Sequence, residues 1–299
     1  MLQKADPRNA SILININGTL HPRESAGISP FDSSVQGGDA VWEGLRLYDG
    51  KIFALTEHLA RLRSSAKALA FDTIPDDETL TDEIRRTLQA NKMHDDVHIR
   101  LTLTRGVKIT SGMDPRLNQS GPTLIVLAEF KPPVYDTDGL SLITSSLRRF
   151  PPDCLDPKIH HANLLQSILA KIEANHAGAD DALMLDRRGF IAETNATHLF
   201  LVENGVLRTP HTHACPEGVT RSTILRLCET ADIATEIADI SLTEAYRADE
   251  LFCTGTMGEL AAITQLDGRR IGNGAAGPMT LTLSRSYRAE ARKNGTPIV

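Results

Sequence analysis

Residues 45–53 read Leu-Arg-Leu-Tyr-Asp-Gly-Lys-Ile-Phe, with an Asp-Gly pair between two apolar runs. Asp-Gly and Asn-Gly pairs flanked by apolar residues are typical of two-residue β-hairpin turns. The same signal recurs at Asn17-Gly18, Asn204-Gly205 and Asp267-Gly268. We therefore predict antiparallel hairpins in both halves of the chain.

Segments with helical spacing separate these hairpins. Behind Thr56, which we expect to cap a helix, apolar residues recur every three or four positions up to Leu69. Further helices are expected over 77–93, 162–177, 219–231 and 278–293, and strands over 97–105, 123–130, 140–147, 181–186, 190–194, 197–202 and 250–254. Hairpins with separate helices favour the α+β class over a regular strand–helix alternation, which argues against a Rossmann or TIM architecture.

The length of 299 residues indicates about two domains. The segment 131–139, KPPVYDTDG, carries two prolines and little apolar periodicity, and is the best candidate for a linker. We expect a small N-terminal α+β domain over 1–130 and a larger C-terminal domain over 140–299.

Composition excludes several classes of protein. Hydrophobic residues make up 41% of the chain, which is ordinary for a globular protein and argues against disorder, collagen and coiled coil. The net charge of −6 shows no basic balance of the kind that nucleic-acid binding needs. No apolar run approaches the length of a membrane span or a signal peptide, so we expect no membrane association and a cytoplasmic location.

Several familiar motifs are missing, and one candidate metal motif is weak. GxxxxGK and GxSxG are absent, which argues against P-loop and serine-hydrolase functions, and GxGxxG occurs only once, at 272–277, where a lone copy is a weak signal for dinucleotide binding. His211, His213 and Cys215 lie close together in sequence, but prolines flank the segment and no second cluster is obvious. We interpret it as a polar loop and predict no metal.

Three other segments indicate a functional site only when they are considered together. Lys158 precedes an amphipathic helix, where a lysine is normally a solvated charge. Gly218-Val219-Thr220 leads into another helix, whose free N–H groups would make an anion site. Thr254-Gly255-Thr256 follows an apolar run and could bring a second hydroxyl to a phosphate.

In this order, these pieces resemble the fold-type IV (class IV) pyridoxal-phosphate aminotransferases, which include branched-chain and D-amino-acid aminotransferases. The resemblance covers roughly residues 12–268, and the ordered set of motifs is far more specific than any one of them. The matching segments are 41–48 (VWEGLRLY), 57–62 (EHLARL), 104–106 (TRG), 157–158 (PK), 181–189 (DALMLDRRG), 192–193 (AE), 204–207 (NGVL), 218–221 (GVTR) and 249–256 (DELFCTGT).

The resemblance implies a cofactor, a fold and an assembly. The cofactor is pyridoxal 5′-phosphate, held between a small and a large domain, and members of the group form homodimers. Lys158 would carry the Schiff base and move the proton, and the carboxylate of Glu193 would pair with the pyridine nitrogen. The phosphate group would be held by Arg61, Val219, Thr220 and Thr256.

The substrate pocket departs from the family pattern. Branched-chain enzymes of the group show Tyr-x-Arg, and D-amino-acid enzymes Arg-x-His, where this chain has His98-Ile99-Arg100. Gly37 stands where a tyrosine is usual, and Trp42 takes an aromatic position. Arg100 and His98 could hold a carboxylate, and Arg23 is a weaker candidate. The substrate-binding residues expected from the resemblance are thus Arg100, His98, Trp42, Met257, Gly37 and Arg23.

The function that the resemblance implies is transfer of an amino group between an amino acid and a 2-oxo acid, such as 2-oxoglutarate or pyruvate, by a ping-pong route. The altered pocket leaves L-branched-chain and D-amino acids equally open as substrates. Three alternatives share the fold: a 4-amino-4-deoxychorismate lyase, an (R)-selective amine transaminase, and a non-catalytic protein that binds pyridoxal phosphate.

Overall fold

The structure, a computed structural model, describes residues 5–135 and 139–299. The described chain divides into two compact units. The small unit contains the described residues up to Pro132, together with Ile159–Asn163 and Ala291–Val299. The large unit contains Pro133–Lys158 and Leu164–Glu290. Residues 136–138 of the expected linker lie outside the described residues, and the division into domains at 1–130, 131–139 and 140–299 stays a prediction.

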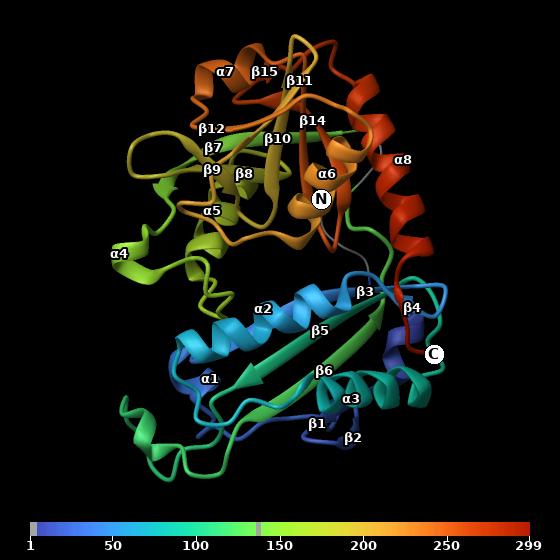
Figure 1. Cartoon of the computed structure of the whole chain (residues 1–299). Helices are drawn as coiled ribbons and strands as arrows, with labels where there is room; N and C mark the ends of the chain where they lie inside the picture. Colours follow the sequence, from blue (N-terminus) through green and yellow to red (C-terminus); the bar gives the residue numbers. More distant parts are fainter. Residues whose placement is uncertain (1–4, 136–138) are drawn as a thin grey trace. The chain divides into compact units, whose positions relative to one another are not determined.

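The small unit is built on a seven-stranded sheet within the described residues (Figure 1), and its strand order is β16-β4-β3-β5-β6-β1-β2. All of its pairs are antiparallel. Its strands are β1 (Leu13–Ile16), β2 (Thr19–Pro22), β3 (Ala40–Tyr48), β4 (Lys51–Ile52), β5 (Val97–Thr104), β6 (Thr123–Phe130) and β16 (Thr296–Pro297).

Two long helices cover one face of this sheet, as Figure 1 shows. They bury an apolar core in which alternate residues of β5, among them Ile99 and Leu101, meet Leu59 of α2 and Ile84 of α3. The opposite face of β5 therefore carries His98 and Arg100. The helical elements are η1 (Pro7–Ser11), α1 (Ser33–Gly37), α2 (Leu55–Ala68), α3 (Asp77–Ala90) and η2 (Pro115–Leu117).

The large unit is built on a mixed sheet, with strand order β12-β11-β10-β13-β14-β7-β8-β9 and β15 paired to β14. Its strands are β7 (Leu140–Arg148), β8 (Asp181–Leu185), β9 (Ile191–Thr194), β10 (His198–Glu203), β11 (Val206–Pro210), β12 (Thr235–Ala238), β13 (Glu250–Gly255), β14 (Glu259–Leu266) and β15 (Arg269–Arg270). Its helices are α4 (Pro152–Leu155), α5 (Leu165–His176), α6 (Val219–Thr230), α7 (Leu242–Arg247) and α8 (Pro278–Lys293), the last of which ends in the small unit.

Three parallel pairs interrupt the antiparallel pattern of the large unit: β7 with β8, β7 with β14, and β11 with β12. β7 pairs with β8 after a crossover that contains α5, and β11 pairs with β12 after a crossover that contains α6. Parallel strands end at the same edge of a sheet. Lys158 lies in the crossover after β7, between α4 and α5, and Gly218 lies in the loop between β11 and α6.

The predicted α+β class and the four hairpins are confirmed. The prediction that Thr56 caps a helix was wrong, because α2 already begins at Leu55 after Ala54, whose φ is +53°. The helix expected over 162–177 begins at Leu165. No helix among the described residues is both long and apolar enough to cross a membrane.

A buried carboxylate supports the small unit. Asp32, fully buried, accepts hydrogen bonds from the hydroxyls of Thr104 (2.9 Å) and Thr123 (2.8 Å) and from the N–H of Ser34 (2.9 Å). These bonds tie the start of α1 to the ends of two strands. A polar group left unpartnered in such a place costs about 1–3 kcal/mol.

Asp32→Ala should therefore lower the free energy of unfolding by about 3 kcal/mol, because it leaves two buried hydroxyls without their acceptor. The fluorescence of Trp42, the one tryptophan of the chain, should follow this in urea. Asp82→Ala, which removes an exposed ion pair with Arg85, should change the same quantity by no more than about 0.5 kcal/mol. Equal effects of the two substitutions would contradict the assignment.

Candidate active site

A tight turn in the large unit links Glu193 at the end of β9 to His198 at the start of β10, two strands that follow each other in the chain. Thr194 and Thr197 close the turn between β9 and β10, with hydroxyl oxygens 2.7 Å apart and the Thr194 N–H donating to the Thr197 carbonyl at 2.8 Å. Glu193 is 3% exposed. The burial expected of a carboxylate with a specific role is thus found at this position.

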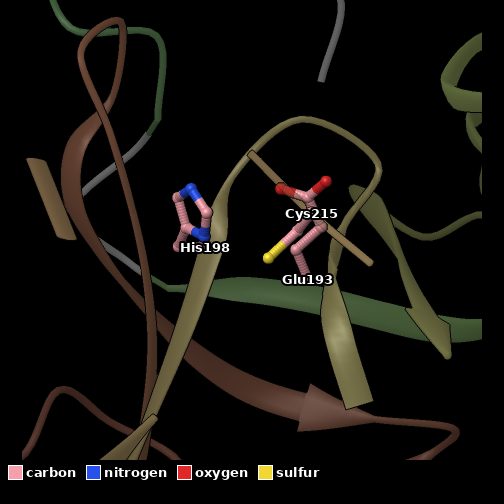
Figure 2. A group of neighbouring side chains, drawn as sticks. All are labelled: Glu193, His198 and Cys215. Atoms are coloured by element: carbon pink, nitrogen blue, oxygen red, sulfur yellow. The ribbon is translucent and has the colours of Figure 1, made fainter. Parts of the chain in front are cut away.

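Glu193, His198 and Cys215 converge in one buried group (Figure 2), and their side-chain ligand atoms all lie within 4.8 Å of one another. Cys215 comes from the loop between β11 and α6. Further along that loop, a Cβ at Gly218 would collide with the imidazole of His198, so only glycine allows the loop to approach this closely. The loop is therefore fitted against the turn that carries Glu193.

Positive charges surround this group. Arg149, at the end of β7, forms an ion pair with Oε1 of Glu193, although no hydrogen bond of acceptable geometry reaches that oxygen. Burial lowers the pKa of Arg149 to about 10. Burial also raises the pKa of the Cys215 thiol to about 11, against the opposing charges of Arg149, Arg221 and Lys158. Lys158, whose side chain is exposed, therefore lies within electrostatic range of Cys215.

The N-terminus of α6 lies beside the same group. Its N-cap residue, Gly218, offers no side chain, and no side-chain hydrogen bond caps the helix. Val219 and Thr220 form the first turn, and Thr220 is buried. Such a helix start presents unpaired N–H groups and a partial positive charge, which suit an anion.

Thr256 and Met257 lie in the turn between β13 and β14. The strand pairing sets Thr254 opposite His198, so this turn begins at the same edge of the sheet. A Cβ at Gly255 would lie 3.1 Å from Cγ2 of Thr197. The large unit thus contains Lys158, and within it the loop before α6 and the Thr256 turn both approach the turn that follows Glu193.

In the small unit, Arg61 binds a buried carboxylate. Its Nε and Nη2 donate to Glu43 at 2.8 and 2.7 Å, and Nδ1 of His58 lies 2.6 Å from the same carboxylate. Burial acts to raise the pKa of Glu43, but His160, Arg61 and His58 oppose it and hold that pKa well below its usual range. Glu43 is therefore ionised and fixes the direction of the Arg61 guanidinium.

Trp42 organises the face of the sheet that carries Arg100. The Cζ atom of Arg100 lies 3.9 Å from the centre of a Trp42 ring, in a cation–π contact. The imidazole of His160 stacks on Trp42 at 4.5 Å, and the indole N–H donates to the carbonyl of His161 at 3.1 Å. Trp42 thus holds Arg100 and the segment that follows Lys158 in the chain.

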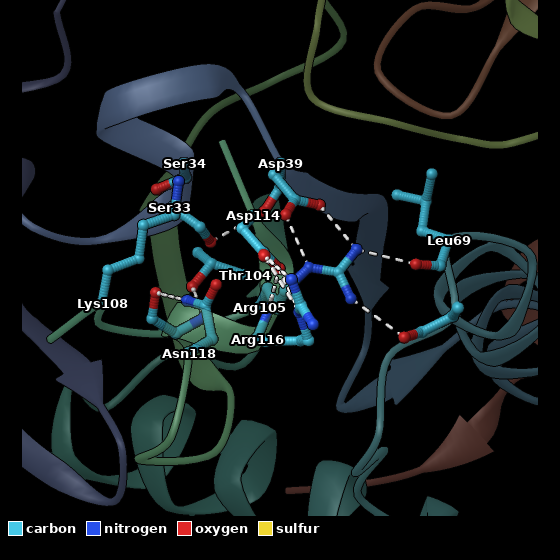
Figure 3. Close-up of polar contacts among 12 residues, drawn as sticks. Ser33, Ser34, Asp39, Leu69, Thr104, Arg105, Lys108, Asp114, Arg116 and Asn118 are labelled. Atoms are coloured by element: carbon cyan, nitrogen blue, oxygen red, sulfur yellow. Dashed lines mark hydrogen bonds and ion pairs between the residues drawn. The ribbon is translucent and has the colours of Figure 1, made fainter. Parts of the chain in front are cut away.

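The motif at 104–106 has a structural explanation, which Figure 3 shows. The guanidinium of Arg105 donates to both oxygens of Asp39, at 2.6 and 3.1 Å, and to the carbonyl of Leu69 at 2.7 Å. It thereby joins the start of β3 to the end of α2. Nearby, Lys108 donates to the Gly112 carbonyl at 2.6 Å.

Two expected substrate residues lie at exposed positions. Gly37 is the last residue of α1 and is exposed. Arg23 is exposed after β2, where its guanidinium donates to the Asn9 carbonyl at 2.8 Å. Their roles, like those of the other site residues, stay predictions.

The sequence did not identify Arg149, His198 or Glu43 as members of these groups. It indicated Cys215 only as part of a weak candidate metal-binding motif. Glu43 lies within a quoted motif, so its position was visible but its partners were not. Arg149 and His198 carry no local signal, because their meaning depends on strand pairing and on a loop that returns from β11.

The chain is similar to known proteins of one family. The model of the family described as Amino-transferase class IV matches residues 40–266. Among curated proteins, the chain is 53% identical to Branched-chain-amino-acid aminotransferase-like protein 1 of Arabidopsis thaliana, over 98% of this chain and 53% of that protein. The chain thus spans about half the length of this relative.

Relatives of similar length carry two kinds of name. A putative branched-chain-amino-acid aminotransferase of Methanocaldococcus jannaschii is 39% identical, covering 95% of this chain and 98% of the relative. A D-alanine aminotransferase of Bacillus licheniformis is 31% identical over 88% and 92%. The solved branched-chain aminotransferase of Thermobaculum terrenum in PLP-form matches with a TM-score of 0.84 and 27% identity, over 95% of each chain.

His98 should make stability depend on pH. Burial, followed by the positive charges of Lys131 and Arg46, lowers the pKa of His98 from 6.5 to about 3. The folded protein keeps the ring neutral while the unfolded chain takes up a proton below pH 6.5, so stability is lost as the pH falls from 6.5 towards 3. Between pH 8 and pH 5 this loss should be about 2 kcal/mol.

His98→Gln should remove that part of the pH dependence. Urea unfolding at pH 8, 6 and 5 measures it as the difference between wild type and variant. Parallel pH profiles for the two proteins would show that His98 is not kept neutral by the fold.

Proposed function

The chain belongs to the class IV aminotransferase family, and on that premise we propose that it is a pyridoxal-phosphate-dependent aminotransferase. It transfers an amino group between an amino acid and a 2-oxo acid. The observation that carries this proposal is the buried Glu193 in the same unit as Lys158, the uncapped start of α6 and the Thr256 turn.

The residues of the large unit fit the cofactor. The buried Oε1 of Glu193 is in an ion pair with Arg149 but has no hydrogen bond of acceptable geometry, and such a buried carboxylate suits the protonated nitrogen of a pyridine ring. The unpaired N–H groups of Val219 and Thr220, with the Thr256 hydroxyl, suit a phosphate. Pyridoxal phosphate, when bound, supplies an aldehyde and an electron-withdrawing ring.

Each residue then has a separate task. The Lys158 amine holds the cofactor covalently and afterwards moves a proton to or from the substrate Cα. The Glu193 carboxylate keeps the ring nitrogen protonated. Arg61 supplies a permanent positive charge for the phosphate, and Glu43 orients its guanidinium. Asp or Glu alone could not replace Lys158, because only an amine condenses with an aldehyde.

We propose that Arg100 and His98 form the carboxylate-recognition surface, with Trp42 and Met257 as apolar neighbours of the substrate. Burial lowers the pKa of Arg100, so an anionic group would be stabilised there by charge. His98, kept neutral, offers a hydrogen bond rather than a charge. Gly37 and Arg23 are the remaining proposed substrate residues. The substrate is an amino acid, either L-branched-chain or D.

We also propose a homodimer. One side of α5 exposes four apolar side chains at helical spacing, and a second copy of this chain is the occupant that fits the family's assembly. They are Leu165 (66% exposed), Ile168 (51%), Leu169 (49%) and Ile172 (42%). The cytoplasmic location expected from the sequence stays a prediction.

The amino-acid class can be tested without an acceptor. The protein loaded with pyridoxal phosphate should lose its visible absorbance band on mixing with a substrate amino acid. Bleaching by L-valine or L-leucine would assign the L-branched-chain class, and bleaching by D-alanine the D class. Release of pyruvate from aminodeoxychorismate would favour the lyase, a response to primary (R)-amines alone the amine transaminase, and no response to any amine the non-catalytic protein.

The role of Lys158 can be tested by mass. Borohydride treatment of the loaded protein should fix the cofactor's mass on the peptide that contains Lys158. Lys158→Ala should lose this label and lower transamination by at least about a thousandfold, because a single amine performs both tasks. Lys67→Ala, an exposed lysine on α2, is the matched control and should keep both. A label that persists in Lys158→Ala would exclude the assignment.

The dimer can be tested by sedimentation. Ile168→Asp places a charge in the apolar stripe of α5 and should convert the dimer to a monomer with an unchanged circular-dichroism spectrum. Thr282→Asp adds the same charge at an exposed position of α8 and should remain dimeric. Sedimentation of the wild type as a monomer at micromolar concentration would reject the proposal.

A further inference from the structure

A group of potential metal ligands lies outside the residues assigned above. His211 directly follows β11, and Asp239 directly follows β12. These strands are parallel neighbours whose last residues, Pro210 and Ala238, lie opposite each other in register. The next residue of each strand therefore leaves the sheet at the same place, which brings His211 beside Asp239. The chain turns after His211, so that His213 also lies beside Asp239.

The spacing of the three side chains suits one ion. Their ligand atoms all lie within 4.8 Å of one another. The rings of His211 and His213 stack, with centres 4.9 Å apart. A tetrahedral zinc with bonds of about 2.1 Å needs ligand atoms about 3.4 Å apart. The three side chains are half-buried or exposed, so rotating them can bring their ligand atoms to the spacing that zinc needs without moving the sheet.

The chemistry of the donors selects the kind of ion. Two imidazoles and one carboxylate are a borderline donor set that suits Zn²⁺, whereas Mg²⁺ and Ca²⁺ require a shell of oxygens. Three protein ligands leave one tetrahedral position for water, which the exposure of His213 permits.

Arg188 competes for the carboxylate. It donates to both oxygens of Asp239 at 2.8 Å and also pairs with Asp186. A metal needs only one oxygen of Asp239, and Asp186 can keep the guanidinium neutralised when it withdraws. Arg188 therefore weakens the site without blocking it, and this gives a substitution that should strengthen binding.

We propose that His211, His213 and Asp239 form a binding site for Zn²⁺ that ties the start of the β11–α6 loop to the end of β12. The loop continues to Cys215 and Gly218, which pack against Glu193 and His198. Zinc bound at its start restrains the segment that presents the N-terminus of α6. The site is structural, and no step of the proposed reaction depends on it.

Zinc binding by the whole protein saturated with pyridoxal phosphate tests this site. Titration against a chromogenic chelator should show one Zn²⁺ per chain, not displaced by millimolar Mg²⁺. Loss of even an outer-shell partner weakens metal binding roughly 10–100-fold, so His211→Ala, His213→Ala and Asp239→Asn should each weaken it at least 10-fold. Arg188→Gln should strengthen it, and His176→Ala, an exposed histidine on α5, should leave it unchanged.

Two controls separate this site from the buried group. Cys215→Ser should bind zinc like the wild type, because Cys215 belongs to the other set of donors. Hydrogen exchange of residues 211–218 should slow on zinc addition in the wild type and not in Asp239→Asn. Wild-type affinity in both histidine variants, or loss of binding in Cys215→Ser, would overturn the proposal, whatever the outcome of the transamination tests.

Discussion

A carboxylate taken out of water must be matched by a positive charge or by hydrogen-bond donors, and the polar architecture of both units follows from this requirement. In the large unit, Glu193 faces Arg149 at the end of β7. In the small unit, Glu43 is surrounded by Arg61, His58 and His160. Each carboxylate holds the guanidinium of a neighbouring arginine in one orientation. A phosphate or carboxylate ligand requires a cation that is held in this way.

The large unit satisfies this requirement with loops rather than with one continuous element. The hydroxyls of Thr194 and Thr197 close the turn that returns the chain to His198. Gly218 lets the next loop approach that imidazole, so α6 starts where its N–H groups can serve a phosphate. Parallel pairing of β11 with β12 gathers His211 and Asp239 at the same edge. The tight packing couples these loops, so a restraint on one bears on the others.

Local sequence predicted the elements well because their signals are local. Asp49-Gly50 and the other three turn pairs each place two residues in the left-handed region, which few other pairs tolerate, and all four hairpins are confirmed. The run rich in Val, Ile, Leu and Thr over 97–105 correctly predicted a strand. Thr56 does not cap the helix because the turn at Phe53-Ala54, directly after β4, already leads the chain into α2 at Leu55.

By itself, the sequence determined the α+β class, the positions of most strands and helices, and the resemblance from which the cofactor and Lys158 follow. Only the tertiary structure decided that Arg149 faces Glu193, that Arg100 stacks on Trp42, and that His211 meets Asp239. The reason is physical. Turn and periodicity signals act over a few residues, whereas these contacts join residues brought together by strand register and loop return, which no local pattern encodes.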